Sequence, residues 1–240
     1  MLKIVLMGYG KMGKKIEEIA LSYGYSIHSI IDENNYKTFD FSKLKDADIA
    51  IEFTSPNTVV ENIYKCFDVN LPIVVGTTGW NKDYLKVKEY CIKNKKTLFY
   101  ASNFSIGVNI MFEINKKIAS LINNKSFKIN ITETHHINKI DSPSGTAISL
   151  ANDIIKQTSN YDSFVNNKKA LAKELPIISK RKGNVIGNHT VKYFNNDEIL
   201  EIKHKAKNRD IFANGALLAA KWLVGKKGFY EMSDLINNKK

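Results

Sequence analysis

The sequence predicts an α/β protein, in which a Rossmann-type doubly wound parallel sheet is followed by a second α+β domain with an open mixed sheet. Three observations predict this fold. Short apolar runs alternate with segments of helical periodicity up to residue 104, and a glycine-rich turn follows the first run. The pattern then changes to alternation of single apolar and polar residues, which is typical of a strand in an antiparallel or mixed sheet.

The first part of the chain contains the elements of a parallel sheet. Residues 2–7 predict a buried strand, a helical pattern follows the glycine turn, and residues 27–31 predict a second strand that ends at Asp32. The pattern continues with strands at 49–53, 73–75 and 97–100 and with helices at 58–67 and about 81–93. Strands that alternate with helices predict βαβ units and therefore parallel pairing.

The second part of the chain has a different rhythm. A long helix is expected near 106–122, and apolar residues alternate with polar ones over 127–132. Further expected elements are strands at 191–193 and 199–202, a turn at 195–197 between them, and an apolar helix at 211–223. The polar stretch 157–169 predicts a loose loop. We expect one domain over 1–104, a second over 105–209, and a segment over 210–240 that returns to the first.

Composition restricts the classes of protein. With 43% hydrophobic residues among 240, the chain is not of the disordered class, and it has no apolar run long enough to span a bilayer. The start does not resemble a signal peptide, and Cys66 and Cys91 lack CxxC spacing, so we expect a cytoplasmic protein with reduced thiols. The net charge of +12 suits an anionic small substrate, whereas the scattered lysine pairs argue against a nucleic-acid partner. No membrane partner is expected.

A GxGxxG turn predicts a dinucleotide site. It follows a strand and opens a helix, so its amides could approach a pyrophosphate. Asp32 lies 19 residues after the last glycine and could accept hydrogen bonds from a ribose diol, and Glu33 follows it. Two carboxylates would repel a ribose 2′-phosphate, so NADH is expected to be preferred, with NADPH possible. The alternative is a glycine turn without a ligand. The turn residues are Gly8, Tyr9, Gly10, Lys11, Met12 and Gly13.

Two more loops follow predicted strands and could line the nicotinamide end of the same cofactor, because ligands of open parallel sheets bind beyond the carboxyl ends of the strands. Ordinary turns rich in Gly, Thr and Asn are the alternative. The candidate residues are Gly76, Thr77, Thr78, Ala101, Ser102, Asn103 and Phe104.

The stretch THHINKIDSPSGTA, residues 134–147, predicts a carboxylate site. His135 and His136 end a strand with side chains on opposite sides, and Lys139 follows in an irregular segment. Pro143 suits the first turn of a helix, where the segment 144–146 would present free amide groups. Zinc is an alternative, although no third clustered ligand is apparent, and two structural histidines are another. A second segment, 181–189, is either a turn or a means of bringing Arg181 to an anion.

Taken together, these segments resemble the 4-hydroxy-tetrahydrodipicolinate reductase family, formerly called dihydrodipicolinate reductases, of bacterial and plant lysine and diaminopimelate synthesis. The resemblance covers nearly the whole chain, and the block at 133–147 is its most specific part. The matching segments are GYGKMG at 8–13, FTSP at 53–56, GTTG at 76–79, ASNFSIGVN at 101–109, ETHHINKIDSPSGTA at 133–147, RKGNVIGNH at 181–189 and HKAKNRDIFANGALLAAKWL at 204–223.

The resemblance implies an NAD(P)H-dependent reduction of 4-hydroxy-2,3,4,5-tetrahydrodipicolinate with loss of water. It implies that His135 is the catalytic acid, Lys139 a second proton donor, and His136, Gly145 and Thr146 the carboxylate-binding residues. It implies a dinucleotide-binding first domain and a homotetramer assembled through a second domain that also binds the substrate. A glutamate is usual where Asn188 stands, and the segment 150–180 is short.

Two other functions remain open from the residues alone. One is another two-domain NAD-dependent dehydrogenase of amino-acid metabolism, which would share the glycine turn but would not need the block at 133–147. The other is a basic protein that binds nucleic acid or senses a nucleotide.

Overall fold

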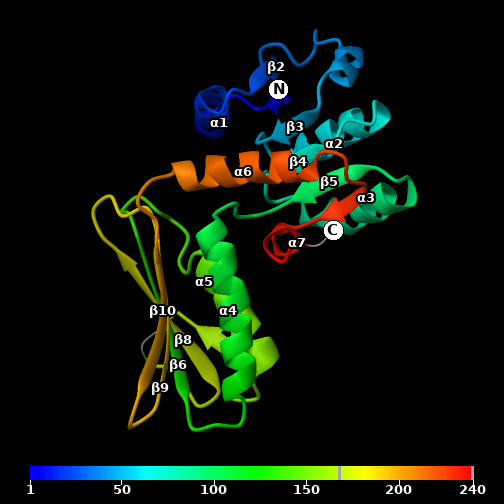
Figure 1. Cartoon of the computed structure of the whole chain (residues 1–240). Helices are drawn as coiled ribbons and strands as arrows, with labels where there is room; N and C mark the ends of the chain where they lie inside the picture. The colour runs from blue at the N-terminus through cyan, green and yellow to red at the C-terminus, as the bar shows by residue number, and fades with distance from the viewer. Residues whose placement is uncertain (167–168, 239–240) are drawn as a thin grey trace. The chain divides into compact units, whose positions relative to one another are not determined.

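The computed structural model describes residues 1–166 and 169–238. They form two compact units, one made of Met1–Ile106 with Asp210–Lys240 and the other of Gly107–Arg209 (Figure 1). Within the described ranges, no helix has both the length and the apolar character needed to cross a membrane.

The first unit contains the predicted parallel sheet, whose strand order is β11-β5-β4-β3-β1-β2. All of its pairings are parallel, and the order reverses direction between β1 and β3, as in a doubly wound sheet. The fold class expected from the sequence is thus confirmed, and only β11 was not expected. The strands are β1 Lys3–Met7, β2 Ser26–Ile31, β3 Ile49–Glu52, β4 Ile73–Val75, β5 Thr97–Tyr100 and β11 Gly228–Tyr230.

Helices cover both faces of this sheet, which explains why its strands are continuously apolar. Ile4 of β1 belongs to a core cluster with α1 and α6, whereas its neighbour Val5 belongs to a cluster with α2 and α3. The expected C-terminal helix is α6, which packs against α1 in the first unit. The helices are α1 Lys11–Ser22, α2 Val59–Asp68, α3 Asn81–Lys93, α6 Asp210–Leu223 and α7 Met232–Ile236, with a 3₁₀ helix at Phe41–Asp46.

The second unit contains a mixed sheet of order β10-β9-β6-β8-β7. Strand β6 pairs with β8 in parallel and with β9 antiparallel, so the expected mixed sheet is confirmed. Helices α4 (Ile106–Ile122) and α5 (Gly145–Gln157) lie on one face of the sheet and share its core (Figure 1). The strands are β6 Lys128–His135, β7 Ser163–Val165, β8 Glu174–Arg181, β9 Asn188–Phe194 and β10 Ile199–Lys205.

Two sequence expectations for the second unit require correction. The expected loop at 157–169 contains strand β7, which pairs with β8; Asn167 and Lys168 lie outside the described residues. Strand β8 itself was missed. It includes Pro176, which has no amide hydrogen to donate and therefore weakens any prediction of a strand. Its neighbour β7 is only three residues long, so this proline lies near the edge of the sheet.

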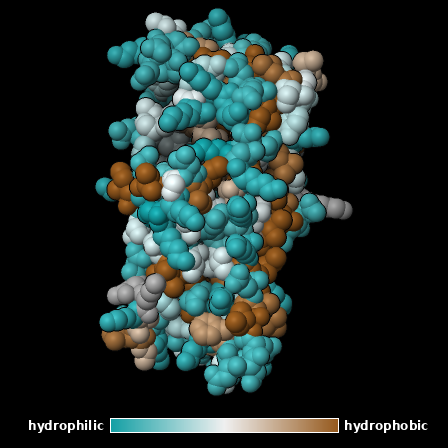
Figure 2. All heavy atoms as spheres, turned by 90° about the vertical axis from the view of Figure 1, so that its left-hand side faces the viewer, coloured by the Kyte–Doolittle hydropathy of each residue, from teal (hydrophilic) through white to brown (hydrophobic). Residues whose placement is uncertain are grey.

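Both cysteines are free and buried, as expected of packed thiols. Burial raises the pKa of the Cys66 thiol well above its usual range and that of Cys91 to about 11, so both are protonated and unreactive at neutral pH. The face drawn in Figure 2 is largely hydrophilic, with hydrophobic residues in separate patches. Ile199 and Leu200, at the start of the edge strand β10, are exposed apolar residues.

Candidate functional site

The glycine turn of the first unit connects the end of β1 to the start of α1. Gly8 has φ +91°, and a Cβ there would lie 2.1 Å from the carbonyl oxygen of Phe53. A Cβ on Gly13 would lie 2.2 Å from the carbonyl oxygen of Gly8. Gly10, the N-cap of α1, has no atom within 4 Å of a Cβ position. The first and third glycines are therefore required by packing, whereas the second leaves open space that fits a dinucleotide phosphate.

A cavity of about 730 Å³ adjoins this turn. It is lined by Gly8, Tyr9, Gly10 and Asp32 of the predicted cofactor set, together with Glu33 and residues after β3. The carboxylate of Asp32 accepts hydrogen bonds from the backbone N–H and the side-chain amide of Asn34, at 2.9 and 3.2 Å. Lys14 and Lys37 also line the cavity, although no motif in the sequence pointed to them.

The remaining predicted cofactor residues do not line this cavity. Lys11, Met12 and Gly13 begin α1, and the others lie in the loops after β4 and β5. The ring of Phe53 connects two of these loops, because a Cβ on Gly76 would lie 2.1 Å from it and the Phe104 ring is 5.7 Å away. Thr77 is buried, and its Oγ1 accepts a hydrogen bond of 2.8 Å from the Thr54 amide. The others differ in exposure: Ala101 is buried, Met12 and Asn103 are half-buried, and Lys11, Thr78 and Ser102 are exposed.

Beneath these loops lies a buried acid that the sequence analysis missed. Glu52 ends β3 with no exposed surface, and its carboxylate accepts hydrogen bonds from the Thr54 amide, the Thr54 hydroxyl and the Asn62 side chain. Burial raises the pKa of Glu52 above its usual range, and these hydrogen bonds oppose that rise.

In the second unit, His135 is the last residue of β6 and is buried. Its Nδ1 forms a hydrogen bond with Oε2 of Glu133, and Nη1 of Arg181 donates to Oε1 of the same carboxylate at 2.9 Å. Burial alone would raise the pKa of Glu133, but the hydrogen bonds from His135 and Arg181 lower it to about 2. Glu133 is therefore an anion at neutral pH.

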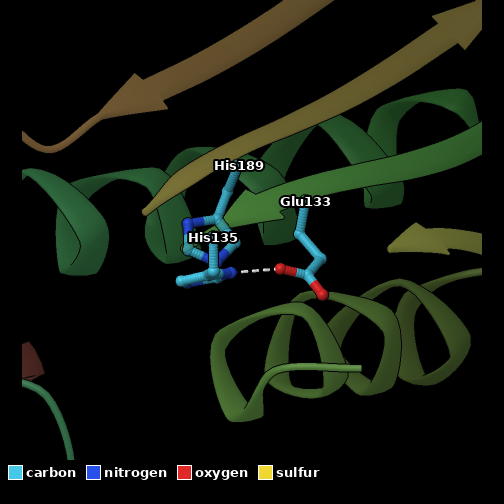
Figure 3. A group of neighbouring side chains, drawn as sticks. All are labelled: Glu133, His135 and His189. Atoms are coloured by element: carbon cyan, nitrogen blue, oxygen red, sulfur yellow. Dashed lines mark hydrogen bonds and ion pairs between the residues drawn. The ribbon is translucent and has the colours of Figure 1, made fainter. Parts of the chain in front are cut away.

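A second imidazole completes this group, which consists of Glu133, His135 and His189 (Figure 3). The ring of His189, in β9, lies 5.1 Å from that of His135, and its Nε2 lies 3.2 Å from Oγ of Ser144. Burial, reinforced by the charge of His135, lowers the pKa of His189 to about 3, so this imidazole is neutral. Ser144 is the N-cap of α5 and accepts a hydrogen bond from the Ala147 amide. His189 and Ser144 therefore connect His135 to the start of α5.

The other predicted substrate residues lie at the start of α5 and in the segment that follows β6. Gly145 and Thr146 form the first turn of α5, whereas Pro143 precedes the N-cap, so the expectation that Pro143 occupies the first turn is wrong. The ammonium of Lys139 lies 2.7 Å from a carboxylate oxygen of Asp141. His136 is outside the group, and its Nε2 lies 3.5 Å from the guanidinium of Arg209.

Arg181 is held by several hydrogen bonds within the protein. In addition to Glu133, its guanidinium donates to the carbonyl oxygens of Lys139 (3.2 Å), Lys180 (2.8 Å) and Asp141 (2.5 Å). All three of its nitrogens are thus engaged by the protein, and Arg181 also lines a cavity of the second unit.

Two further possible metal ligands lie beside His135, although neither is its sequence neighbour His136. Glu133, His135 and His189 offer ligand atoms that all lie within 4.8 Å of one another. Glu133 lies two residues before His135 on the same face of β6, which the sequence could have indicated. His189 is brought in by the antiparallel register, in which it pairs with Glu133. The guanidinium of Arg181 already neutralises Glu133, and this positive charge disfavours a cation.

A larger cavity of about 1290 Å³ in the second unit adjoins this group, because Thr134 and Arg181 line it. Its lining includes Arg181, Asn188 and several lysines, but the predicted substrate residues are not among the residues that line it. Its positive charge would attract anions in general. Because none of the predicted substrate residues lines this cavity, the group around His135 remains the candidate substrate site.

Comparison with known proteins matches both units. Residues 2–104 match the family described as dihydrodipicolinate reductase, N-terminus, and residues 107–236 match its C-terminus. A 4-hydroxy-tetrahydrodipicolinate reductase of Christiangramia forsetii is 42% identical over 240 residues, covering 99% of this chain and 98% of the relative. One from Staphylococcus carnosus is 36% identical over 249 residues, covering 99% of this chain and all of the relative.

Among solved structures, the dipicolinate-bound dihydrodipicolinate reductase of Paenisporosarcina sp. TG-14 superposes with a TM-score of 0.80. It covers 96% of this chain and 97% of that structure at 22% identity, which supports the fold. A probable dehydrogenase from Thermotoga maritima has a TM-score of 0.58 at 12% identity, covering 98% of this chain and 93% of that structure. With both halves matched by the family and full-length relatives well above 30% identity, the chain belongs to the 4-hydroxy-tetrahydrodipicolinate reductase family of oxidoreductases.

Proposed function

We propose that this enzyme reduces 4-hydroxy-2,3,4,5-tetrahydrodipicolinate to 2,3,4,5-tetrahydrodipicolinate with loss of water, in the diaminopimelate route to lysine. Family membership supports the reaction. The observation that carries the mechanism is the buried His135, held by Glu133 and connected through His189 to the start of α5. This arrangement combines a proton donor with a helix start, and helix starts attract carboxylates.

The first unit would bind the cofactor through the glycine turn and the carboxylate of Asp32. The open space at Gly10 and the adjoining cavity fit a pyrophosphate and its ribose. Bound NAD(P)H supplies a hydride to C4 of the unsaturated ring. The loops that carry Gly76 to Thr78 and Ala101 to Phe104 would line the nicotinamide end.

The second unit would bind the dicarboxylate and supply the proton. His136 and the first-turn residues Gly145 and Thr146 would hold the carboxylates, because a helix start presents amide groups that the helix itself does not pair. His135 would donate the proton that the reduced ring requires, and Lys139 would neutralise a carboxylate and act as a second donor. Hydride transfer requires that the nicotinamide ring contact the bound dicarboxylate.

A direct assay tests this function. The loss of NADH absorbance is followed with substrate formed in situ from pyruvate and aspartate semialdehyde, and pyridine-2,6-dicarboxylate is then added as a planar mimic of the ring. We expect turnover that the mimic inhibits by competing with the substrate. Absence of turnover with both NADH and NADPH would remove this function from consideration.

We further propose that NADH is preferred over NADPH. Asp32 and Glu33 both line the cavity, and two carboxylates there disfavour a 2′-phosphate. Lys14 and Lys37 line the same cavity and oppose this effect, so we expect a moderate preference rather than exclusion. The ratio of kcat/KM for the two cofactors measures it, and a value in favour of NADPH would contradict the proposal.

We also propose a cytoplasmic homotetramer assembled through the second unit. Strand β10 is an edge of the mixed sheet and exposes Ile199 and Leu200, which favours burial against another copy. Free buried thiols suit a reducing compartment. Light scattering after size-exclusion chromatography tests the assembly; the double variant Ile199→Lys with Leu200→Lys should lower the mass, and a monomeric wild type would contradict it.

A further inference from the structure

Glu133 is a fully buried carboxylate with both oxygens engaged. Oε2 bonds with Nδ1 of His135, and Oε1 accepts from Arg181 at 2.9 Å (Figure 3 shows the first of these contacts). A surface ion pair would contribute little, but removing one partner of a buried pair leaves an uncompensated charge. This carboxylate has no contact assigned to it in binding the cofactor or the substrate, so its position beside His135 needs another explanation.

Arg181 extends the arrangement to the second proposed proton donor. Its Nε and Nη2 donate to the carbonyl oxygens of Lys139 and Asp141, at 3.2 and 2.5 Å. His135 and Arg181 are partners in the register of the parallel pair β6 and β8, so the sheet itself places the guanidinium beside the imidazole. One arginine thus joins the strand that carries His135 to the loop that carries Lys139.

We propose that Glu133 and Arg181 are positioning residues for the two proton donors. Glu133 holds the His135 ring with Nδ1–H directed at its carboxylate, so that Nε2 exchanges the proton, and Arg181 holds the backbone from which Lys139 extends. This inference rests on the proposed function, because it takes His135 as the acid.

The chemistry of the acceptor determines which nitrogen is free. An ionised carboxylate only accepts hydrogen bonds, so Nδ1 must carry hydrogen whether the ring is neutral or charged. Nε2 then alternates between N–H and lone pair as the ring gives up and regains its proton. A Cβ on Gly187 would lie 3.1 Å from this Nε2, so the glycine keeps that nitrogen uncrowded. A buried carboxylate orients the imidazole of serine proteases in the same way.

The ring tautomer of the wild-type enzyme tests the proposal without any change to the site. Nitrogen NMR with labelled histidine distinguishes Nδ1–H from Nε2–H in the neutral ring, and the signals missing in His135→Asn identify those of His135. We expect hydrogen on Nδ1. Neutral His135 with hydrogen on Nε2 would overturn the proposal.

Glu133→Gln tests the consequence for catalysis, since an amide can donate as well as accept and no longer enforces one tautomer. We expect kcat to fall on the order of 10²-fold, with KM and the affinity for pyridine-2,6-dicarboxylate changed less than about threefold. Glu133→Asp should restore part of kcat because it restores an anionic acceptor. Asp153→Asn, which removes another carboxylate of the same unit from α5, should leave kcat unchanged.

The outcomes of these experiments distinguish the positioning role from the assignment of the acid. Unchanged kcat in Glu133→Gln, or an equal loss in Asp153→Asn, would reduce Glu133 to a structural ion pair. If Glu133→Gln does not fold, the wild-type tautomer still decides. If His135→Ala keeps near-normal kcat, the assignment of the acid under the proposed function is wrong; if His135→Ala is inactive while Glu133→Gln is normal, only the positioning role is wrong.

Discussion

The carbonyl oxygen of Gly8 lies against Gly13, so close that a Cβ on Gly13 would approach it to 2.2 Å. The same turn leaves Gly10 without any atom within 4 Å of a Cβ position. The glycines of one fingerprint therefore have different roles, and substitution of each by alanine should separate them. Packing requires Gly8 and Gly13, whereas open space for a ligand surrounds Gly10.

We expect Gly13→Ala to lower the free energy of unfolding by about 1–3 kcal/mol, because the new methyl group clashes with backbone. Gly10→Ala should change stability by less than about 1 kcal/mol, since its φ of −78° is accessible to alanine. It should nevertheless weaken NADH binding at least about tenfold. Chemical denaturation and cofactor fluorescence titration measure the two effects. Equal loss of stability in both variants would contradict this division of roles.

His135→Ala and Lys139→Ala should each lower kcat on the order of 10²–10⁴-fold, which is the usual scale for loss of a general acid. Steady-state kinetics with saturating NADH measure the effect, and circular dichroism confirms that the variants are folded. Near-normal kcat in both would remove them from the catalytic residues.

His136→Ala and Thr146→Ala should mainly raise KM for the dicarboxylate, with kcat little changed, if they serve binding in the ground state. The dissociation constant of pyridine-2,6-dicarboxylate should rise in parallel. A fall in kcat at constant KM would instead assign them to the reaction step.

His189 makes stability depend on pH. Its pKa is about 3 in the folded protein against 6.5 as the ordinary value, so below pH 6.5 the unfolded chain binds a proton that the folded chain does not. The stability that neutral His189 contributes is thus fully present above pH 6.5 and is lost as pH falls towards 3, by about 1.4 kcal/mol per pH unit.

From pH 7 to pH 5, His189 should therefore reduce the free energy of unfolding by about 2 kcal/mol. Glu133 does not contribute in this range. Its pKa is lowered from 4.5 to about 2, so the stability that its anionic form contributes is lost only as pH falls below 4.5. Urea denaturation at both pH values should show a smaller difference in His189→Gln than in the wild type. An identical difference would mean that His189 is not the group that titrates.

Ser144→Ala should lower the free energy of unfolding by about 1 kcal/mol, because α5 loses the side chain that accepts the Ala147 amide. It should also raise KM for the dicarboxylate, since the first turn carries Gly145 and Thr146. Ser163→Ala, at an exposed position in β7, is the control and should alter neither quantity. Unchanged stability in Ser144→Ala would argue against this cap.

The fold class, the strands of the first unit up to β5 and the membership of the family could all be predicted from the amino-acid sequence. This is possible because these features are local: apolar periodicity reports whether a strand or helix is buried, and the glycine turn lies within one contiguous segment. Helix α3 and strands β4 and β5 begin and end at the residues expected from the sequence.

The residues around His135 could be identified only in the folded protein. The sequence left open whether the segment that begins at Arg181 is a turn or brings this residue to an anion. The parallel register of β6 with β8 places its guanidinium beside Glu133. His189 had no role in the sequence analysis, and the antiparallel register of β6 with β9 brought it opposite Glu133. These partners lie 48 and 56 residues from Glu133. Periodicity assigns each side chain to a face of its own strand, but contacts between strands depend on register, which only the folded sheet sets.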